Sequence, residues 1–204
     1  MGGHIPLGSD AFWTEPTTNK PMDTRYVVFF RDPLFRYVSQ FLFARQLREG
    51  NKTRASMSLP GVLADIEQTV HKHKGPKREK LSNFLMTPAQ RNWAARENVQ
   101  WTVERRLNIS QANLIEHNVL VGIVEDMPAS LRLMQDLMDG QNKLAGAYQF
   151  YAKQQPSSSQ SSSKTRAVVD AIQSNATLHS LFQDYLKHEY TIYNFALHLH
   201  KLQV

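Results

Sequence analysis

The sequence predicts an α/β fold in which helices flank a parallel sheet. Two apolar runs, at residues 26–30 and 119–124, lack the polar alternation of a strand with one wet face. Each run leads at once into a helix-forming sequence, and such strand-to-helix units are typical of parallel sheets, because a crossover must carry the chain back to the next strand. We therefore expect both strands to be covered on both faces.

Helices are predicted from apolar residues that recur at helical spacing. The first begins after the first strand, where Asp32 stands in the N-cap position and Pro33 in the first helical position. Further helices are expected, in chain order, over residues 62–70, 99–116, 127–138 and 178–197. The last of these is a long amphipathic helix, and everything beyond residue 165 should be helical.

Two polar segments are predicted as loops within one domain. The basic stretch 71–80 is broken by Gly75-Pro76, and the Ser-rich stretch 154–165 is too polar to pack, so it should be a flexible loop. A chain of 204 residues is long enough for one folded unit, and we expect a single domain over residues 1–204.

The composition favours an anionic partner and excludes several kinds of site. The chain carries 24 Lys and Arg against 18 Asp and Glu, a net charge of +6. The absence of Cys excludes disulfides, thiolate metal sites and cysteine nucleophiles, and no histidines show the spacing of metal ligands, so no metal is predicted. No targeting signal is present, nor an apolar run near the roughly 20 residues of a membrane span. Sequons at Asn51, Asn108 and Asn175 are a weak indication of a lumenal glycoprotein.

The segment 31–39 is the most informative part of the sequence. The strand ends at Arg31, the helix that follows offers free N–H groups and the positive end of its dipole, and Ser39 lies two turns in. These groups suit a bound phosphate. The alternative is an ordinary helix start with Arg31 in a surface ion pair.

Three blocks of the chain, in order, match those of the sulfotransferases that act on glycans. Residues 2–5 (Gly-Gly-His-Ile) resemble a strand ending in Gly-His, residues 26–45 resemble the block R-D-P-x-x-R-x-x-S, and residues 113–126 resemble the strand N-L-I…V-G-V-T-E-E. Residues 186–196 match the closing helix more weakly, in which an acidic residue precedes Y-x-F-A. The chain most resembles the heparan sulfate 2-O-sulfotransferase and uronyl 2-O-sulfotransferase group.

The resemblance implies a fold like that of P-loop kinases and a donor, 3′-phosphoadenosine 5′-phosphosulfate (PAPS). Arg31 and Ser39 fall on the positions that bind the donor's 3′-phosphate, and His4 falls on the histidine that takes the proton from the acceptor hydroxyl. A histidine titrates near neutral pH, as a general base requires, although His4 is otherwise read as an exposed terminal residue. Lys164 and Arg166 end the Ser-rich segment, where the family has a loop that closes over the donor, and a plain loop is the alternative.

The acceptor implied by the resemblance is a uronic-acid-containing glycan rather than a nucleic acid. Arg36, Arg45, Lys77 and Arg78 are candidates to contact this acidic sugar, with solvated surface charge as the alternative. The resemblance also implies the Golgi lumen, behind a membrane anchor that this sequence does not contain. The oligomeric state is not indicated.

One departure from the family concerns the donor site. The family has a strand, a Lys-containing loop and a helix upstream of the Gly-His block, and no such unit precedes residue 2 here. We therefore expect an N-terminally truncated sequence that by itself transfers no sulfate, and a longer chain that does. The alternative is an inactive pseudoenzyme that binds acidic glycans. Nucleic-acid binding is a weaker third hypothesis, because no recognised binding module is present.

Overall fold

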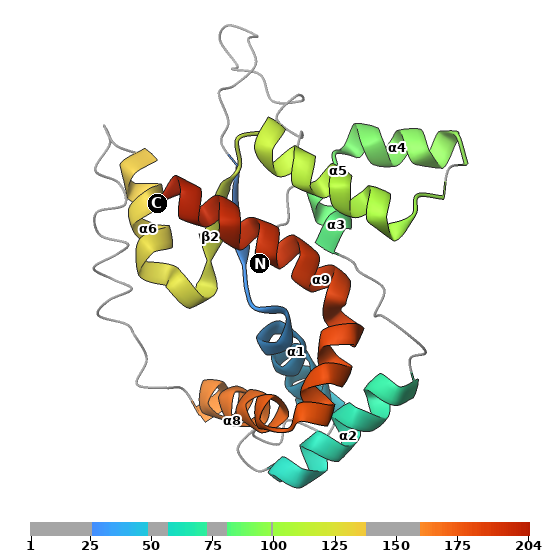
Figure 1. The fold of residues 1–204 in the computed structure, drawn as a ribbon, viewed down its shortest axis with the longest axis vertical. Coiled ribbons are helices and arrows are strands. Elements are labelled where there is room, and N and C mark those ends of the chain that lie inside the picture. Colours follow the sequence, from blue (N-terminus) through green and yellow to red (C-terminus); the bar gives the residue numbers. More distant parts are fainter. Residues whose placement is uncertain (1–25, 49–56, 73–80, 99, 138–159) are drawn as a thin grey trace, which may run out of the picture. The chain divides into compact units, whose positions relative to one another are not determined.

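The computed structural model describes residues 26–48, 57–72, 81–98, 100–137 and 160–204, which fall into two compact units (Figure 1). The described residues of the first unit lie in 26–30, 81–133 and 191–204, and those of the second lie in 31–72 and 134–190. We describe each unit by itself. The single domain over 1–204 therefore stays a prediction.

A two-stranded parallel sheet forms the centre of the first unit and confirms the predicted α/β class. Strand β1 (Val27–Phe30) pairs with β2 (Leu120–Ile123), and Phe29 lies opposite Gly122. Every residue of β2 is buried, but Val27 and Phe29 are 44% and 42% exposed, so the prediction that both strands are covered on both faces is wrong for β1. A Cβ at Gly122 would lie 2.5 Å from the Phe29 ring, so the cross-strand ring requires glycine there.

The first unit also contains two helices that the sequence analysis did not predict. Helices α3 (Leu81–Leu85) and α4 (Pro88–Arg96) precede α5 (Val103–Glu116), which confirms the predicted helix from residue 103 onward. Thr87 and Gln90 form a complete capping box at the start of α4, so the motif Thr-x-x-Gln was the signal for this helix. After β2 the chain forms the 3-10 turn η3 (Val124–Asp126) and α6 (Met127–Leu137), where a helix was predicted.

Side chains near the C-terminal end of α9 (Ala176–Gln203) form hydrogen bonds with the backbone of β2 and of Val119. The amide of Gln203 accepts from the N–H of Val121 at 3.0 Å and donates to the carbonyl of Val119 at 2.9 Å. Nδ1 of the buried His200 lies 2.8 Å from the carbonyl oxygen of Val121. Side chains of α9 thus satisfy backbone groups that no further described strand pairs.

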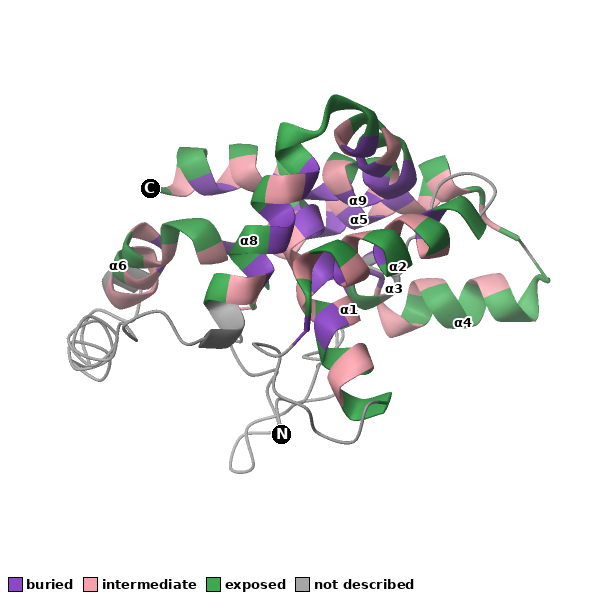
Figure 2. Cartoon of the chain, turned by 90° about the horizontal axis from the view of Figure 1, so that it is seen from below, coloured by how far each residue is buried: buried purple, intermediate pink, exposed green. Residues whose placement is uncertain are grey.

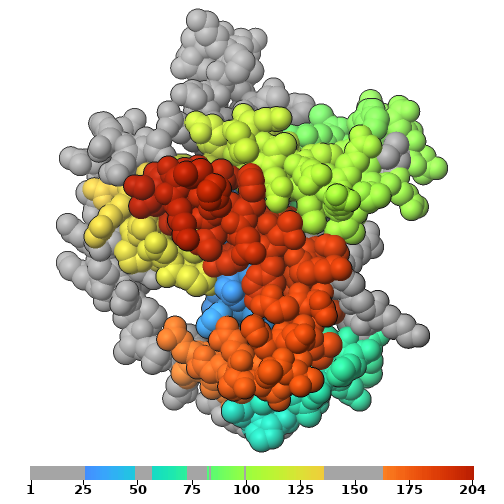
Figure 3. All heavy atoms as spheres, in the orientation of Figure 1, coloured from blue at the N-terminus to red at the C-terminus, as the bar shows by residue number. Residues whose placement is uncertain are grey.

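The second unit is a helical cluster around one apolar core. Helix α8 (Gln160–Ser174) packs against α1 (Pro33–Arg48) and α2 (Leu59–Lys72), and Figure 3 shows α8 and α2 side by side. Figure 2 shows buried residues alternating with intermediate and exposed ones along these helices. The core comprises mainly aliphatic and aromatic residues, among them Leu34, Val38, Leu42, Val62, Ile66, Val168, Ile172, Phe182 and Leu186.

Helix α8 corrects the predicted Ser-rich loop. The loop was predicted over 154–165, but residues 160–165 are helical, while 154–159 lie outside the described residues. Thr165 is 2% exposed and lies one turn before Val168 and Val169, so it extends the buried face of α8 toward its N-terminus. Tertiary packing on α1 and α2 therefore outweighs the low helix propensity of serine.

Candidate functional site

The candidate anion site lies at the first turn of α1, in the second unit. Asp32 caps this helix: its Oδ1 accepts from the N–H of Phe35 at 3.0 Å, and its carbonyl accepts from the N–H of Arg36 at 2.9 Å. The hydroxyl of Tyr190, on α9, accepts from the N–H of Leu34. Pro33 has no N–H and the N–H of Phe35 is bound by the Asp32 cap, so binding of an anion by free N–H groups of this turn stays a prediction.

Arg31 contacts the ring of Phe35, and Ser39 lies one helical turn beyond that residue. The guanidinium carbon of Arg31 is 5.8 Å from the centroid of the Phe35 ring. Both side chains are partly exposed. An anion held here would be bound by a guanidinium and a hydroxyl rather than by the helix backbone, and its binding stays a prediction.

Two consecutive residues of α9 hold the first turn of α1 in place. The carboxylate of Glu189, which is 2% exposed, forms an ion pair with Arg36, and Tyr190 reaches the N–H of Leu34. The sequence analysis missed both roles. The available signal was an acidic residue on the apolar face that Phe182, Tyr185 and Leu186 mark on this helix, because a buried carboxylate requires a charged or hydrogen-bonding partner.

Both candidate arginines of α1 have acidic partners within the second unit. Arg36 pairs with Glu189, and Nη1 of Arg45 lies 2.6 Å from Oδ2 of Asp65 on α2. These pairs give each guanidinium a structural role that the sequence did not reveal. Their contact with an acidic sugar therefore stays a prediction.

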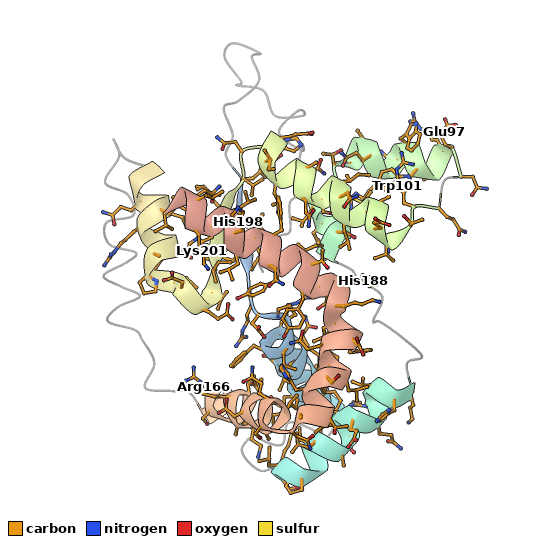
Figure 4. All side chains as sticks on the ribbon, in the orientation of Figure 1. Glu97, Trp101, Arg166, His188, His198 and Lys201 are labelled. Carbon is orange, nitrogen blue, oxygen red and sulfur yellow. The ribbon has the colours of Figure 1, made fainter. Side chains whose placement is uncertain are left out.

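Two of the remaining candidate site residues lie on α8, and the other three lie outside the described residues. Lys164 is partly buried and Arg166 exposed, and both lie in the first half of α8, which packs against α1. Figure 4 labels Arg166 on this helix. His4, Lys77 and Arg78 lie outside the described residues. The structure thus brings Arg31 and Ser39 to one helix face and places two further cations on a neighbouring helix.

Buried tyrosines give the second unit a predictable response to alkaline pH. Burial is the main cause that raises the pKa of Tyr37, Tyr185 and Tyr190, and Tyr37 also donates a hydrogen bond to Tyr185. Because the folded state keeps these phenols protonated, the stabilisation is complete below the ordinary pKa of 10 and is lost as pH rises above it. We expect the free energy of unfolding to fall by up to about 1.4 kcal/mol per pH unit for each tyrosine.

Chemical denaturation between about pH 9 and pH 11 measures this slope. Tyr37→Phe removes one titrating group, so its slope should be smaller than that of the unsubstituted protein by one tyrosine's share. An identical slope in both proteins would show that Tyr37 ionises without unfolding.

Two kinds of feature were also sought across the described ranges. No helix there is both long and apolar enough to cross a lipid bilayer. No cluster of three or more His, Asp or Glu side chains there is arranged to hold a metal ion. His200 instead serves packing against β2, and His198, on the same helix, is exposed (Figure 4).

Comparison with known proteins finds a family match over most of the chain. A family model described as "Sulfotransferase family" matches residues 10–196. No curated protein and no solved structure matches the sequence. The matched residues include the first turn of α1, the strand β2 and most of α9.

Proposed function

The chain belongs to the sulfotransferase family, and we propose that it transfers a sulfuryl group from PAPS to a hydroxyl of a uronic-acid-containing glycan. The order and spacing of its motifs support a place in the 2-O-sulfotransferase-like group of this family. A fold like that of P-loop kinases and a site of action in the Golgi lumen follow from the same resemblance and belong to this proposal.

One observation carries the proposal: Arg31 lies over the ring of Phe35, one helical turn before Ser39, in the helix that directly follows a parallel strand. In open α/β sheets, ligands bind beyond the carboxyl ends of the strands, and Arg31 immediately follows the end of β1. A guanidinium and a hydroxyl are suitable donors to the oxygens of a 3′-phosphate. Lys164 and Arg166 add positive charge on α8 for the same nucleotide.

The proposed reaction is an in-line displacement at sulfur. The acceptor hydroxyl oxygen forms a bond to sulfur while the bond from sulfur to the bridging oxygen of the 5′-phosphate breaks. The hydroxyl proton passes to His4, and adenosine 3′,5′-bisphosphate leaves with the electron pair of the broken bond. Arg36, Arg45, Lys77 and Arg78 are proposed to contact the acidic acceptor, and no metal takes part.

Binding of adenosine 3′,5′-bisphosphate tests the proposed donor site. Because a ligand that binds only the folded state stabilises it, the nucleotide should raise the melting temperature of the protein by a few degrees. Arg31→Ala should abolish this shift, since it removes the guanidinium beside Phe35. The matched control is Arg48→Ala, an exposed arginine in the last turn of the same helix, which should keep the full shift.

The other outcomes have definite meanings. A full shift in Arg31→Ala would move the donor site away from α1. No shift in the unsubstituted protein, together with binding to an acidic glycan, would favour the alternative of a pseudoenzyme that binds glycans without transferring sulfate.

A further inference from the structure

An exposed aromatic surface lies on the first unit, on helix α4 and the segment that leads into α5. Trp93 of α4 is 46% exposed, and its ring centroid lies 6.0 Å from that of Trp101, in the segment before α5. The guanidinium carbon of Arg105, in the first turn of α5, lies 5.9 Å from the centroid of the Trp101 ring. Trp101 therefore lies between α4 and α5 (Figure 4). We call these three residues, Trp93, Trp101 and Arg105, the tryptophan surface.

A partly buried polar network links the helices that carry the tryptophan surface. The side-chain amides of Gln90 on α4 and Asn113 on α5 donate to each other, at 3.0 and 2.8 Å. Asn113, which is 1% exposed, also donates to the carbonyl of Leu85 on α3 at 2.6 Å. Gln90 is in addition part of the capping box that begins α4. Three helices are thus tied together behind an exposed indole, and a preorganised surface of this kind loses little entropy on binding.

Helix α4 has no buried residue, and Figure 2 shows it largely exposed. Trp93 is thus a large aromatic side chain on a helix that buries none of its residues. A large exposed aromatic side chain is an indication of a binding surface when polar groups surround it. Around Trp93 the helix carries exposed arginines, at Arg91 and Arg96, and its C-terminal end carries the exposed Glu97. Glu104 adds another exposed carboxylate in the first turn of α5.

We propose that the tryptophan surface binds an acidic oligosaccharide. The apolar face of a pyranose ring would lie against the Trp93 indole, and a neighbouring uronate carboxylate would pair with Arg105. The mixed charge favours this ligand over single-stranded nucleic acid, because a phosphate at every nucleotide would meet Glu97 and Glu104, whereas a uronic-acid glycan has one carboxylate per disaccharide. The inference rests on the proposed function only for the class of glycan.

Calorimetric titration with a uronic-acid-containing octasaccharide tests the proposal. We expect Trp93→Ala to weaken binding by about tenfold, as for loss of one aromatic contact, and Trp93→Phe to retain most of the affinity. Arg105→Gln should weaken binding and make the affinity less dependent on salt concentration. A neutral oligosaccharide of the same length should bind more weakly than the octasaccharide. The control is Arg48→Gln, which changes an exposed arginine of the second unit and should bind normally.

Two further measurements separate this proposal from the donor site. Trp93→Ala should keep the melting-temperature shift caused by adenosine 3′,5′-bisphosphate, and Arg31→Ala should keep its affinity for the octasaccharide. The octasaccharide should also protect indole fluorescence of the unsubstituted protein from acrylamide quenching, a readout that needs no variant.

Normal octasaccharide binding by Trp93→Ala, or no protection of indole fluorescence, would overturn the proposal. Tighter, Trp93-dependent binding of a single-stranded RNA oligonucleotide would also overturn it and assign the surface to nucleic acid. If adenosine 3′,5′-bisphosphate does not raise the melting temperature of the unsubstituted protein but glycan binding still depends on Trp93, the proposed donor site is refuted and the tryptophan surface is retained.

Discussion

Replacing Arg36 with methionine should lower the free energy of unfolding by about 3–5 kcal/mol, because it leaves the buried carboxylate of Glu189 without its guanidinium. Methionine preserves much of the length of the arginine stem, so the change tests the charge more than the packing. The side chain of Glu189 is 3% exposed, so water cannot readily replace the lost partner. Urea unfolding, followed by circular dichroism, measures the effect.

Arg45→Met is the matched control for this experiment. It breaks the ion pair to Asp65, whose side chain is 52% exposed, on the same helix and in the same unit. Exposed pairs of this kind contribute about 0–1 kcal/mol, so Arg45→Met should change stability far less than Arg36→Met. Equal effects of the two substitutions would show that burial of Glu189 does not decide the strength of its pair.

The comparison also bears on the proposed glycan contacts. If Arg36 acts mainly by holding Glu189, the double variant Arg36→Met with Glu189→Leu should regain stability relative to Arg36→Met, because an apolar pair replaces a buried charge that has lost its guanidinium. A glycan contact of Arg36 would remain lost in that double variant. Stability and glycan affinity, measured together, therefore separate the two roles.

The elements that follow local rules were the ones that the sequence predicted well. The strands at 26–30 and 119–124, the Asp32 cap and the long C-terminal helix depend on apolar runs, helical spacing and capping chemistry, and all are present. Helix α4 depends on the capping box at Thr87 as well, but it has no buried residue, so a search for apolar periodicity passes over it.

Features that depend on contacts between residues far apart in the sequence could not be predicted from local sequence patterns. Helix α8 packs against α1 and α2, and the serine-rich composition of its first turns does not indicate this contact. The first turn of α1 also has a distant neighbour in Glu189, whose buried carboxylate pairs with Arg36 from more than 150 residues away along the chain. The sequence therefore located the candidate anion site at Arg31 and Ser39 but not the groups that hold its helix in place.

His4→Ala should reduce the turnover number for sulfate transfer by about 10²-fold or more, because the acceptor hydroxyl would lose its general base. The assay uses the full-length product of the gene, with PAPS and a uronic-acid-containing polysaccharide. A factor of 10² corresponds to about 2.7 kcal/mol of transition-state stabilisation, well within what one catalytic group provides. The apparent affinity for PAPS should change little, because the proposed contacts to the donor come from Arg31, Ser39, Lys164 and Arg166.

The control for His4→Ala is His198→Ala, which removes an exposed histidine of α9 and should leave turnover unchanged. A histidine base also predicts that turnover rises with pH as the base loses its proton and that this rise disappears in His4→Ala. Full turnover in His4→Ala, with the pH profile intact, would remove His4 from the chemistry. Because donor binding and proton transfer are assigned to different residues, that result would still leave the donor site at Arg31 and Ser39 to be judged by nucleotide binding alone.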